Sequence, residues 1–214
     1  ACSVRAGMGA LLAAHDAAGA GRGVSLATLS DVRIGAPEGQ VEQSGGDAAA
    51  AFAFGGGKVI AEVEATYSET LEYLASWRTP DQRFAKSWEE RFALTQAYVP
   101  LLSSAAKAIA AQAKLAPSDL AAVILDAPNP RAAAAVAGAL KLDPARVVGD
   151  MSATVGWTGA AHGGLMLAAA LDRAKPGDRI LVISVSDGVD ALLLRATDAI
   201  ASYPRARTVE SLIA

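Results

Sequence analysis

Cysteine and histidine are almost missing from this chain of 214 residues, which has one cysteine, Cys2, and two histidines, His15 and His162. A single thiol cannot form an internal disulfide, and so few thiolate and imidazole ligands argue against a zinc or iron–sulfur centre. We therefore expect a protein without a metal site, and a reducing cytoplasm as its compartment.

Long apolar runs are missing as well, because the hydrophobic stretches are short, rich in alanine and interrupted by charge or proline. This pattern predicts a soluble protein without a membrane-spanning helix. The net charge is only -3 and the Lys and Arg residues are scattered, so neither a nucleic-acid surface nor a polybasic membrane patch is predicted. Metabolites and other proteins remain as partners.

What the chain does have is a hydrophobic content of 52%, enough for one compact domain or for two fused half-domains that share a core. Helical and strand patterns alternate, which indicates an α/β protein with helices covering a mixed sheet. Helices are expected near residues 8–18, 94–114, 131–140 and 159–173. Strands are expected near residues 24–29, 48–54, 59–74, 121–128, 145–149, 179–186 and 191–197.

Glycines punctuate this pattern. Glycines 55–57 predict a turn joining the strands at 48–54 and 59–74, although the alanines of the first strand would also permit a helix. The DGVD sequence at 187–190 predicts a hairpin between the last two strands. Residues from 202 onward are expected to form a tail.

The segment 76–93 is the most polar and aromatic part of the chain, and we expect it to cross the surface between two blocks, 1–75 and 94–214. The helix–strand–strand order recurs loosely in both blocks. This recurrence suggests a duplicated architecture.

Cys2 lies directly ahead of the first predicted helix. A thiol at the first turn of a helix meets unpaired backbone N–H groups and the positive end of the helix dipole, and both lower its pKa. The small residues around it would let such a helix pack closely. Cys2 is therefore a candidate nucleophile, and the alternative is that it is simply a small buried hydrophobic residue.

Five motifs follow one another along the chain: ACSVRAGMGALLAA at 1–14, GGDAAAAFAFG at 45–55, DAPN at 126–129, GWTGAAHGG at 156–164 and AKPGDRILVISVSDG at 174–188. Each is weak alone. In this order and spacing they resemble the condensing enzymes of the thiolase superfamily, most nearly the branch of hydroxymethylglutaryl-CoA synthase and ketoacyl-carrier-protein synthase III. The resemblance covers almost the whole chain.

This resemblance implies a thiolase-like layered αβαβα fold, with mixed sheets and buried central helices, built from two similar halves. Residues 1–75 would be the remainder of the N-terminal half and residues 94–214 the C-terminal half. The missing N-terminal part, with a glutamate that the synthase branch uses, would precede Ala1.

The resemblance also makes Cys2 the acyl-accepting nucleophile and places the backbone N–H groups of Cys2 and Gly188 at the thioester oxygen. Gly188 has a second explanation, because a hairpin here would require glycine in any protein. Asp126 stands where the family has a histidine that polarises the thioester carbonyl. An ionised carboxylate there would repel a developing oxyanion and raise the pKa of a nearby thiol, unless burial keeps it protonated.

Three further residues are expected to line the substrate site. Asn129 matches the last residue of its motif and is expected to hold the loop. Trp157 stands where the family generally has asparagine or histidine; its indole could close the pocket but replaces a side-chain amide poorly. His162, about one helical turn beyond, could supply a base or a donor, or could simply pack in its alanine-rich helix.

Cations alternate with aromatic residues in the segment 76–93, including Arg91. These side chains could receive the phosphates and adenine of coenzyme A, or could simply be a solvated surface. Asp47 and His15 are expected to have structural roles, the first in capping a turn or a strand edge and the second on an exposed or interfacial helix face.

The resulting hypothesis is an acyltransferase that moves an acyl group from coenzyme A or an acyl carrier protein through Cys2, with hydroxymethylglutaryl-CoA synthase-like condensation as its specific form. No cofactor is expected beyond the coenzyme A thioester as substrate. The resemblance implies a homodimer, with the strand that ends in AFAFGGG at the interface, and an OB-fold partner. The alternative, motivated by Asp126 and Trp157, is a degenerate, non-condensing subunit with a structural or binding role.

Overall fold

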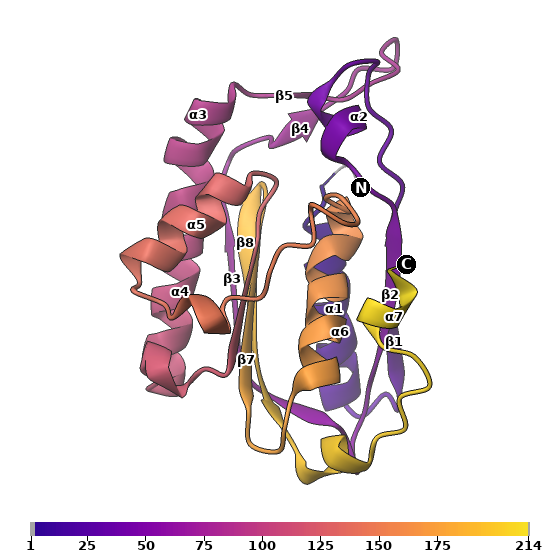
Figure 1. The fold of residues 1–214 in the computed structure, drawn as a ribbon, viewed down its shortest axis with the longest axis vertical. Coiled ribbons are helices and arrows are strands. Elements are labelled where there is room, and N and C mark those ends of the chain that lie inside the picture. Colours follow the sequence, from indigo (N-terminus) through magenta and orange to yellow (C-terminus); the bar gives the residue numbers. More distant parts are fainter. Residues whose placement is uncertain (1–2, 214) are drawn as a thin grey trace.

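Four layers in the order αβαβ make up the protein (Figure 1). The structure is a computed structural model, and it describes residues 3–213. The central layer is a mixed sheet with the strand order β3-β8-β7-β6, in which only the β6–β7 pair is parallel. Its strands are β3 (Ala61–Thr70), β6 (Ala122–Asp126), β7 (Arg179–Val185) and β8 (Gly188–Ala196).

Helices cover both faces of this sheet. On one face lie α4 (Val99–Ala113) and α5 (Pro130–Ala139). On the other face lie α1 (Ala6–Gly19) and α6 (His162–Arg173), and these two helices separate the central sheet from a second, two-stranded sheet (Figure 1). The second sheet pairs β1 (Ser25–Asp31) with β2 (Ala48–Phe54) in antiparallel register.

Short elements decorate these layers. The helical ones are α2 (Gln40–Ser44), α3 (Glu90–Ala93) and α7 (Val209–Leu212). A two-residue pair of strands, β4 (Ser76–Trp77) and β5 (Lys86–Ser87), crosses the top of the molecule in Figure 1. Between α3 and α4 the helix widens into a π-helical turn over Leu94–Tyr98. Single 3-10 turns cover Pro117–Asp119, Pro144–Arg146, Gly159–Ala161 and Asp198–Ser202.

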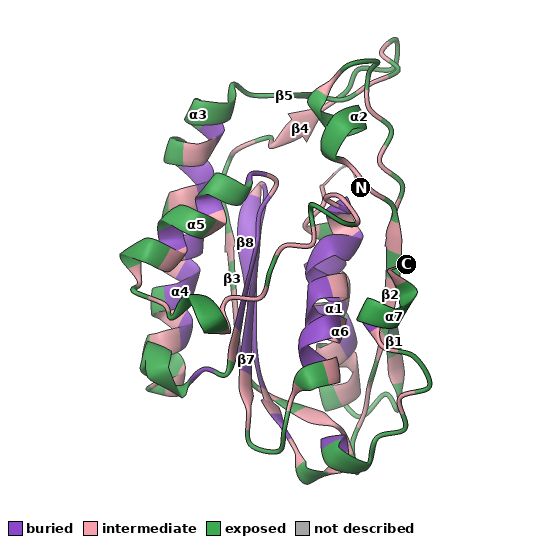
Figure 2. Ribbon diagram, in the orientation of Figure 1, coloured by how far each residue is buried: buried purple, intermediate pink, exposed green. Residues whose placement is uncertain are grey.

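The burial pattern follows from this layering. Strands β7 and β8 are buried along nearly their whole length, because helices cover both faces of the sheet (Figure 2). That is why their sequences are almost continuous apolar runs without alternation. In contrast, β2 alternates between half-buried and exposed residues, because only one of its faces meets α1 and α6.

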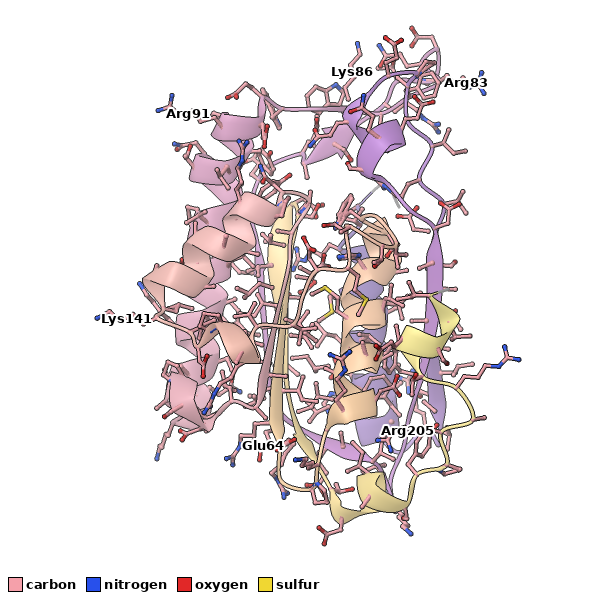
Figure 3. All side chains as sticks on the ribbon, viewed as in Figure 1. Glu64, Arg83, Lys86, Arg91, Lys141 and Arg205 are labelled. Carbon is pink, nitrogen blue, oxygen red and sulfur yellow. The ribbon has the colours of Figure 1, made fainter. Side chains whose placement is uncertain are left out.

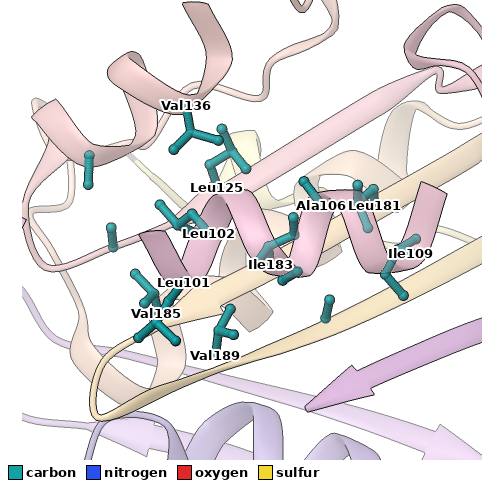
Figure 4. Packing of buried hydrophobic residues seen from close by; sticks show 14 of the residues in the cluster. Leu101, Leu102, Ala106, Ile109, Leu125, Val136, Leu181, Ile183, Val185 and Val189 are labelled. Carbon is teal, nitrogen blue, oxygen red and sulfur yellow. The ribbon is translucent and has the colours of Figure 1, made fainter. Parts of the chain in front are cut away.

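Two hydrophobic clusters form the core, one on each side of the central sheet. The first packs α4 and α5 on the sheet through residues such as Leu102, Val136 and Ile183 (Figure 4). The second lies between the sheet and β1–β2, and it is filled by α1 and α6, whose buried side chains include Leu11 and Leu167. The predicted α/β class, mixed sheet and buried central helices are confirmed; four of the five expected layers are formed by the described residues.

The two strands predicted on either side of glycines 55–57 are present as β2 and β3. They do not pair with each other: β2 pairs with β1 and β3 with β8, so the connection crosses from one sheet to the other. Two other local predictions were wrong. The strand expected at 145–149 is absent, because Asp143 and Pro144 start a 3-10 turn and only a single bridge, Val123 to Val147, remains.

The second concerns the C-terminal tail, which is partly ordered as α7. The backbone N–H of Val209, which is buried, donates to Asp172 of α6 at 2.7 Å. Among the described helices, none combines the length and apolarity that crossing a bilayer requires.

The two glycines of the first turns of α1 should respond in opposite ways to alanine. Gly9 has open space around it, so Gly9→Ala should stabilise the protein by up to about 1 kcal/mol, because alanine restricts the unfolded chain and favours the helix. A Cβ on Gly7 would collide with the backbone carbonyl of Ala160, so Gly7→Ala should destabilise. Urea unfolding of both variants measures this; equal effects would contradict the close approach of α1 to residues 159–161.

Candidate functional site

A cavity of about 270 Å³ opens at the end of the fold where α2, β4 and β5 lie. All five sequence motifs contribute to its wall. The contributing residues, one from each motif in chain order, are Val4, Gly45, Asn129, Trp157 and Ser186. Folding therefore gathers five segments, spread over more than 180 residues, around a single space.

Cys2 lies outside the described residues, so its predicted position at the helix start stays a prediction. The residues that follow it are described. The N–H groups of Ala6 and Gly7 bond to the carbonyls of Ser3 and Val4, so helical hydrogen bonding begins at the residue next to Cys2. Val4, two residues after Cys2, lines the cavity.

Arg5 ties this part of the chain to the central sheet. Its guanidinium makes two hydrogen bonds to the carboxylate of Asp190 in β8, at 2.8 and 3.0 Å. It also donates to the hydroxyls of Ser68 and Thr70 in β3 at 2.8 and 2.9 Å. The Asp190 side chain is only 3% exposed, so its charge depends on this partner.

A second contact supports the first. The Ser3 hydroxyl donates to Asp187 in the β7–β8 turn at 2.5 Å and accepts the backbone N–H of Arg5 at 3.1 Å. The start of the chain is thus fastened both to the strands of the sheet and to the turn that precedes Gly188.

Asp126 lies at the end of β6 and is buried. Its carboxylate accepts hydrogen bonds from the Ser184 hydroxyl at 2.7 Å and from the Trp157 indole N–H at 3.3 Å, with a further bond from the backbone of Gly163. Burial raises the pKa of Asp126 above its ordinary value, and the charge of His162 together with these three donors opposes that shift. The raised pKa fits the hypothesis that burial favours the protonated acid.

His162 begins α6 and is buried. The backbone N–H of Thr158 donates to its Nδ1 at 3.3 Å, and the Thr158 hydroxyl lies 3.2 Å from the same nitrogen. Its ring centre lies 6.5 Å from that of Trp157. His162 therefore belongs to the buried group around Asp126, and it is not part of the cavity wall.

Trp157 separates the cavity from Asp126. Its side chain bonds to Asp126, while the residue lines the cavity, whose wall does not include Asp126. Asp126, Trp157 and His162 are thus brought together, but only Trp157 of the three reaches the space next to Val4. The indole closes the pocket over the acid.

Asn129 lies in the loop between β6 and α5, and both of its side-chain polar atoms have protein partners. Its side-chain oxygen accepts the backbone N–H of Arg131 at 2.9 Å and so caps α5. Its amide nitrogen donates to Glu90 at 2.9 Å and so connects the loop to α3. Both polar atoms are occupied in holding the loop at the cavity wall.

Gly188 begins β8 immediately after the turn. A Cβ here would collide with the carbonyl of Glu69 and with the Arg5 guanidinium, so the close approach of β3 and Arg5 requires glycine. This supports the structural explanation of Gly188 and leaves its role at the thioester oxygen a prediction.

Arg91 and the segment 76–93 lie at the rim. Arg91 points outward from α3 (Figure 3) and is not part of the cavity wall. Lys86 and Trp88 line the cavity. Trp88 packs against Trp77, with ring centres 5.3 Å apart, and donates to the carbonyl of Leu74 at 2.8 Å. The aromatic residues of this segment therefore pack mainly on one another.

Two important side chains were not anticipated from the sequence, Arg5 and Asp190. A single acid in the apolar run GVDALLLRA could have drawn attention to Asp190, and a single cation in the first small-residue motif to Arg5. No cluster of acidic, histidine or cysteine side chains that could hold a metal ion occurs within residues 3–213.

Comparison with known proteins supports the same architecture. The family described as 3-oxoacyl-[acyl-carrier-protein (ACP)] synthase III C terminal matches residues 110–195. The fold matches a crystal structure of 3-oxoacyl-[acyl-carrier-protein] synthase III from Aquifex aeolicus, with a TM-score of 0.76 and 20% identity over 91% of this chain and 65% of that one. The chain belongs to the thiolase-like superfamily.

Other members of the superfamily are similar over most of the chain. The hydroxymethylglutaryl-CoA synthases of Methanopyrus kandleri and Archaeoglobus fulgidus are both 34% identical, over 76% and 84% of this chain. A structure of HMG-CoA synthase complexed with CoA matches with a TM-score of 0.72 and 16% identity, over 92% of this chain and 55% of that one. The thiolase-like chain spans about half the length of these curated relatives, 47% and 53%.

Removing Arg5 should leave Asp190 buried without a partner. Arg5→Met should therefore lower the free energy of unfolding by about 3–5 kcal/mol, whereas Arg195→Met, which breaks an exposed ion pair with Glu62 and Glu64, should cost less than about 1 kcal/mol. Urea denaturation compares the two. The double change Arg5→Met with Asp190→Leu should recover part of the loss, and equal costs for both single variants would argue against a structural ion pair.

The raised pKa of Asp126 makes a prediction about pH. Below the pKa of an unfolded aspartate both states are protonated; above it the folded state holds a proton that the unfolded state has lost. Stability from Asp126 is therefore present at acid pH and declines as pH rises through the folded pKa. The free energy of unfolding of the wild type relative to Asp126→Asn should fall from about pH 4 upward.

This difference is measured by urea unfolding at a series of pH values between acid and neutral. Asp16→Asn, at an exposed carboxylate on α1, is the matched control and should run parallel to the wild type. A wild-type curve parallel to that of Asp126→Asn would show that the buried acid does not retain its proton.

Proposed function

We propose that this chain is part of a thiolase-fold acyltransferase in which Cys2 accepts an acyl group from a coenzyme A or acyl-carrier-protein thioester. The observation that carries the proposal is the single cavity to which each of the five motifs contributes a wall residue, with Val4, two residues after Cys2, among them. The similarity to synthases of hydroxymethylglutaryl-CoA and of 3-oxoacyl carrier protein supports thioester chemistry.

The proposed step is an exchange of thioesters. The Cys2 thiolate attacks the carbonyl carbon of the donor, a bond from that carbon to Sγ forms, and the bond to the donor sulfur breaks. The proton lost by Cys2 passes to the departing thiol, so the charges balance. A second acceptor then takes the acyl group, as two-step covalent catalysis requires.

Backbone groups at the β7–β8 turn are the proposed stabilisers of the negative oxygen that forms on the way. The turn is held against the start of the chain by Ser3 and Arg5, which contact Asp187 and Asp190. Backbone N–H donors that are held in place in this way need no reorganisation during the reaction. Losing one such donor typically costs about 3 kcal/mol of transition-state stabilisation.

Condensation of the hydroxymethylglutaryl-CoA synthase type is the finer proposal, and one observation favours its alternative. Carbon–carbon bond formation needs a group that stabilises the enolate, and Asp126, at the family's histidine position, lies behind Trp157. No histidine among the described residues lines the cavity. This supports the second candidate, a non-condensing member that transfers an acyl group or only binds one.

Assembly and location follow the same proposal. Strand β2 pairs with β1, and its other edge has no partner strand among residues 3–213, so we retain this edge as the proposed homodimer interface. An OB-fold partner that presents the thioester and a cytoplasmic location remain part of the hypothesis.

The test is mass spectrometry of the Cys2 peptide after incubation of the full-length protein with acetyl-CoA and longer acyl-CoA donors. An acyl adduct on Cys2 is expected, because the cavity next to Val4 gives the donor access. The adduct should disappear in Cys2→Ser.

A parallel assay for a carbon–carbon bonded product separates the two candidates. An adduct with a condensation product supports the synthase-like activity, and an adduct without one supports acyl transfer alone. Absence of an adduct with every donor would remove the nucleophile assignment.

A further inference from the structure

Arg33 is a charged side chain in the cavity that none of the predicted roles includes. It follows β1, lines the cavity, and lies over the face of Trp157, with its guanidinium carbon 4.7 Å from the ring centre. Contact with an aromatic face orients the planar guanidinium and stabilises its charge. Arg33 therefore covers the residue that seals Asp126.

The surroundings hold Arg33 in one position. Its backbone N–H donates to Asp47 at 2.8 Å. A Cβ added to Gly45 would lie 3.0 Å from the Arg33 Cβ, and one added to Gly159 would lie 3.0 Å from its Cδ, so two glycine backbones pack along the arginine stem. Little conformational freedom remains to be lost when a ligand binds.

The hydrogen-bonding capacity of this guanidinium is largely unused. Its one side-chain partner among the described residues is Asp31, at a long 3.4 Å, and the same Asp31 oxygen also accepts the Ala160 N–H at 3.0 Å. Within residues 3–213 the buried Nε atom has no partner. A guanidinium has five donors, so most of them are available to a further acceptor.

The cavity has an excess of positive charge. Besides Arg33, its charged wall residues are Lys86 and Glu90. Glu90 accepts the Asn129 amide and pairs with Arg131 at 3.4 Å, so its charge is already compensated. Arg33 is paired in the same way with Asp31 at 3.4 Å, so the excess positive charge of the wall is that of Lys86. An anionic group complements this charge and the free donors of Arg33.

We propose that Arg33 binds a carboxylate at the far end of the acyl group, so that the substrate is a thioester of a short dicarboxylic acid. This rests on the proposed acyl transfer. A carboxylate matches the two-pronged donor pattern of a guanidinium. A space of about 270 Å³ suits a short acyl chain.

The experiment compares two donors of nearly equal shape, succinyl-CoA and 4-methylpentanoyl-CoA, in which an isopropyl group replaces the carboxylate. The rate of adduct formation on the Cys2 peptide is measured for both in the full-length protein. The wild type should prefer the succinyl donor. Arg33→Met should reduce that preference by about tenfold or more, and Arg33→Lys should retain part of it.

Arg22→Met is the matched control, because Arg22 is exposed and lies away from the cavity wall. It should keep the wild-type preference. Thermal unfolding of each variant separates a loss of preference from a loss of folded protein.

Calorimetric binding of both donors to Cys2→Ser, with and without Arg33→Met, distinguishes the two hypotheses. No adduct with any donor would refute the proposed transfer, and binding would then still decide the role of Arg33. Loss of both donors to the same extent on Arg33→Met would mean that Arg33 contacts the coenzyme part or only supports the fold, and the proposal would be overturned. A wild type without preference for the succinyl donor would overturn it as well.

Discussion

The buried ion pair between Arg5 and Asp190 is the interaction on which the cavity depends. The two residues are 185 positions apart, and the pair joins the beginning of the chain to the last strand of the central sheet. An acid buried in an apolar strand is tolerated only with such a partner, so this strand and the chain start must fold together. The contact therefore holds the start of α1 beside the turn between β7 and β8.

Trp157 connects a buried acid and a cation through one ring. Its N–H edge, which is electropositive, donates to Asp126, and its face, which is electronegative, receives the Arg33 guanidinium. Asp126 and Trp157, at the two positions where the resemblance predicts a histidine and an amide, thus form one hydrogen-bonded pair. The buried acid lies at the N–H edge of the indole, and the Arg33 guanidinium lies over its face.

The sequence was informative where structure is local. Strand β7 was predicted because a strand that helices cover on both faces has a continuous apolar sequence. The small-residue helix α6 was predicted as well. The sequence did not show which distant strands pair. The glycine turn before Lys58 can be recognised, but no neighbouring residue indicates that β2 and β3 belong to different sheets. The motifs located Asp126 and Trp157. The hydrogen bond that holds Trp157 between Asp126 and the cavity is a tertiary contact, which the motifs do not reveal. No spacing rule pairs Arg5 with Asp190.

The π-helical turn at Leu94–Tyr98 lies between α3 and α4 in one continuous helix, and it shifts the side-chain positions of α3 relative to those of α4. Upstream of it, and at its end, Ala93 and Tyr98 line the cavity; downstream, Leu102 and Ile109 pack on the central sheet. A π turn holds one residue more than an α turn, so it rotates the first part of the helix relative to the second. Because Ala93 and Tyr98 also belong to the first hydrophobic cluster, a substitution at this part of the cavity wall is transmitted directly to the packing that keeps the domain folded.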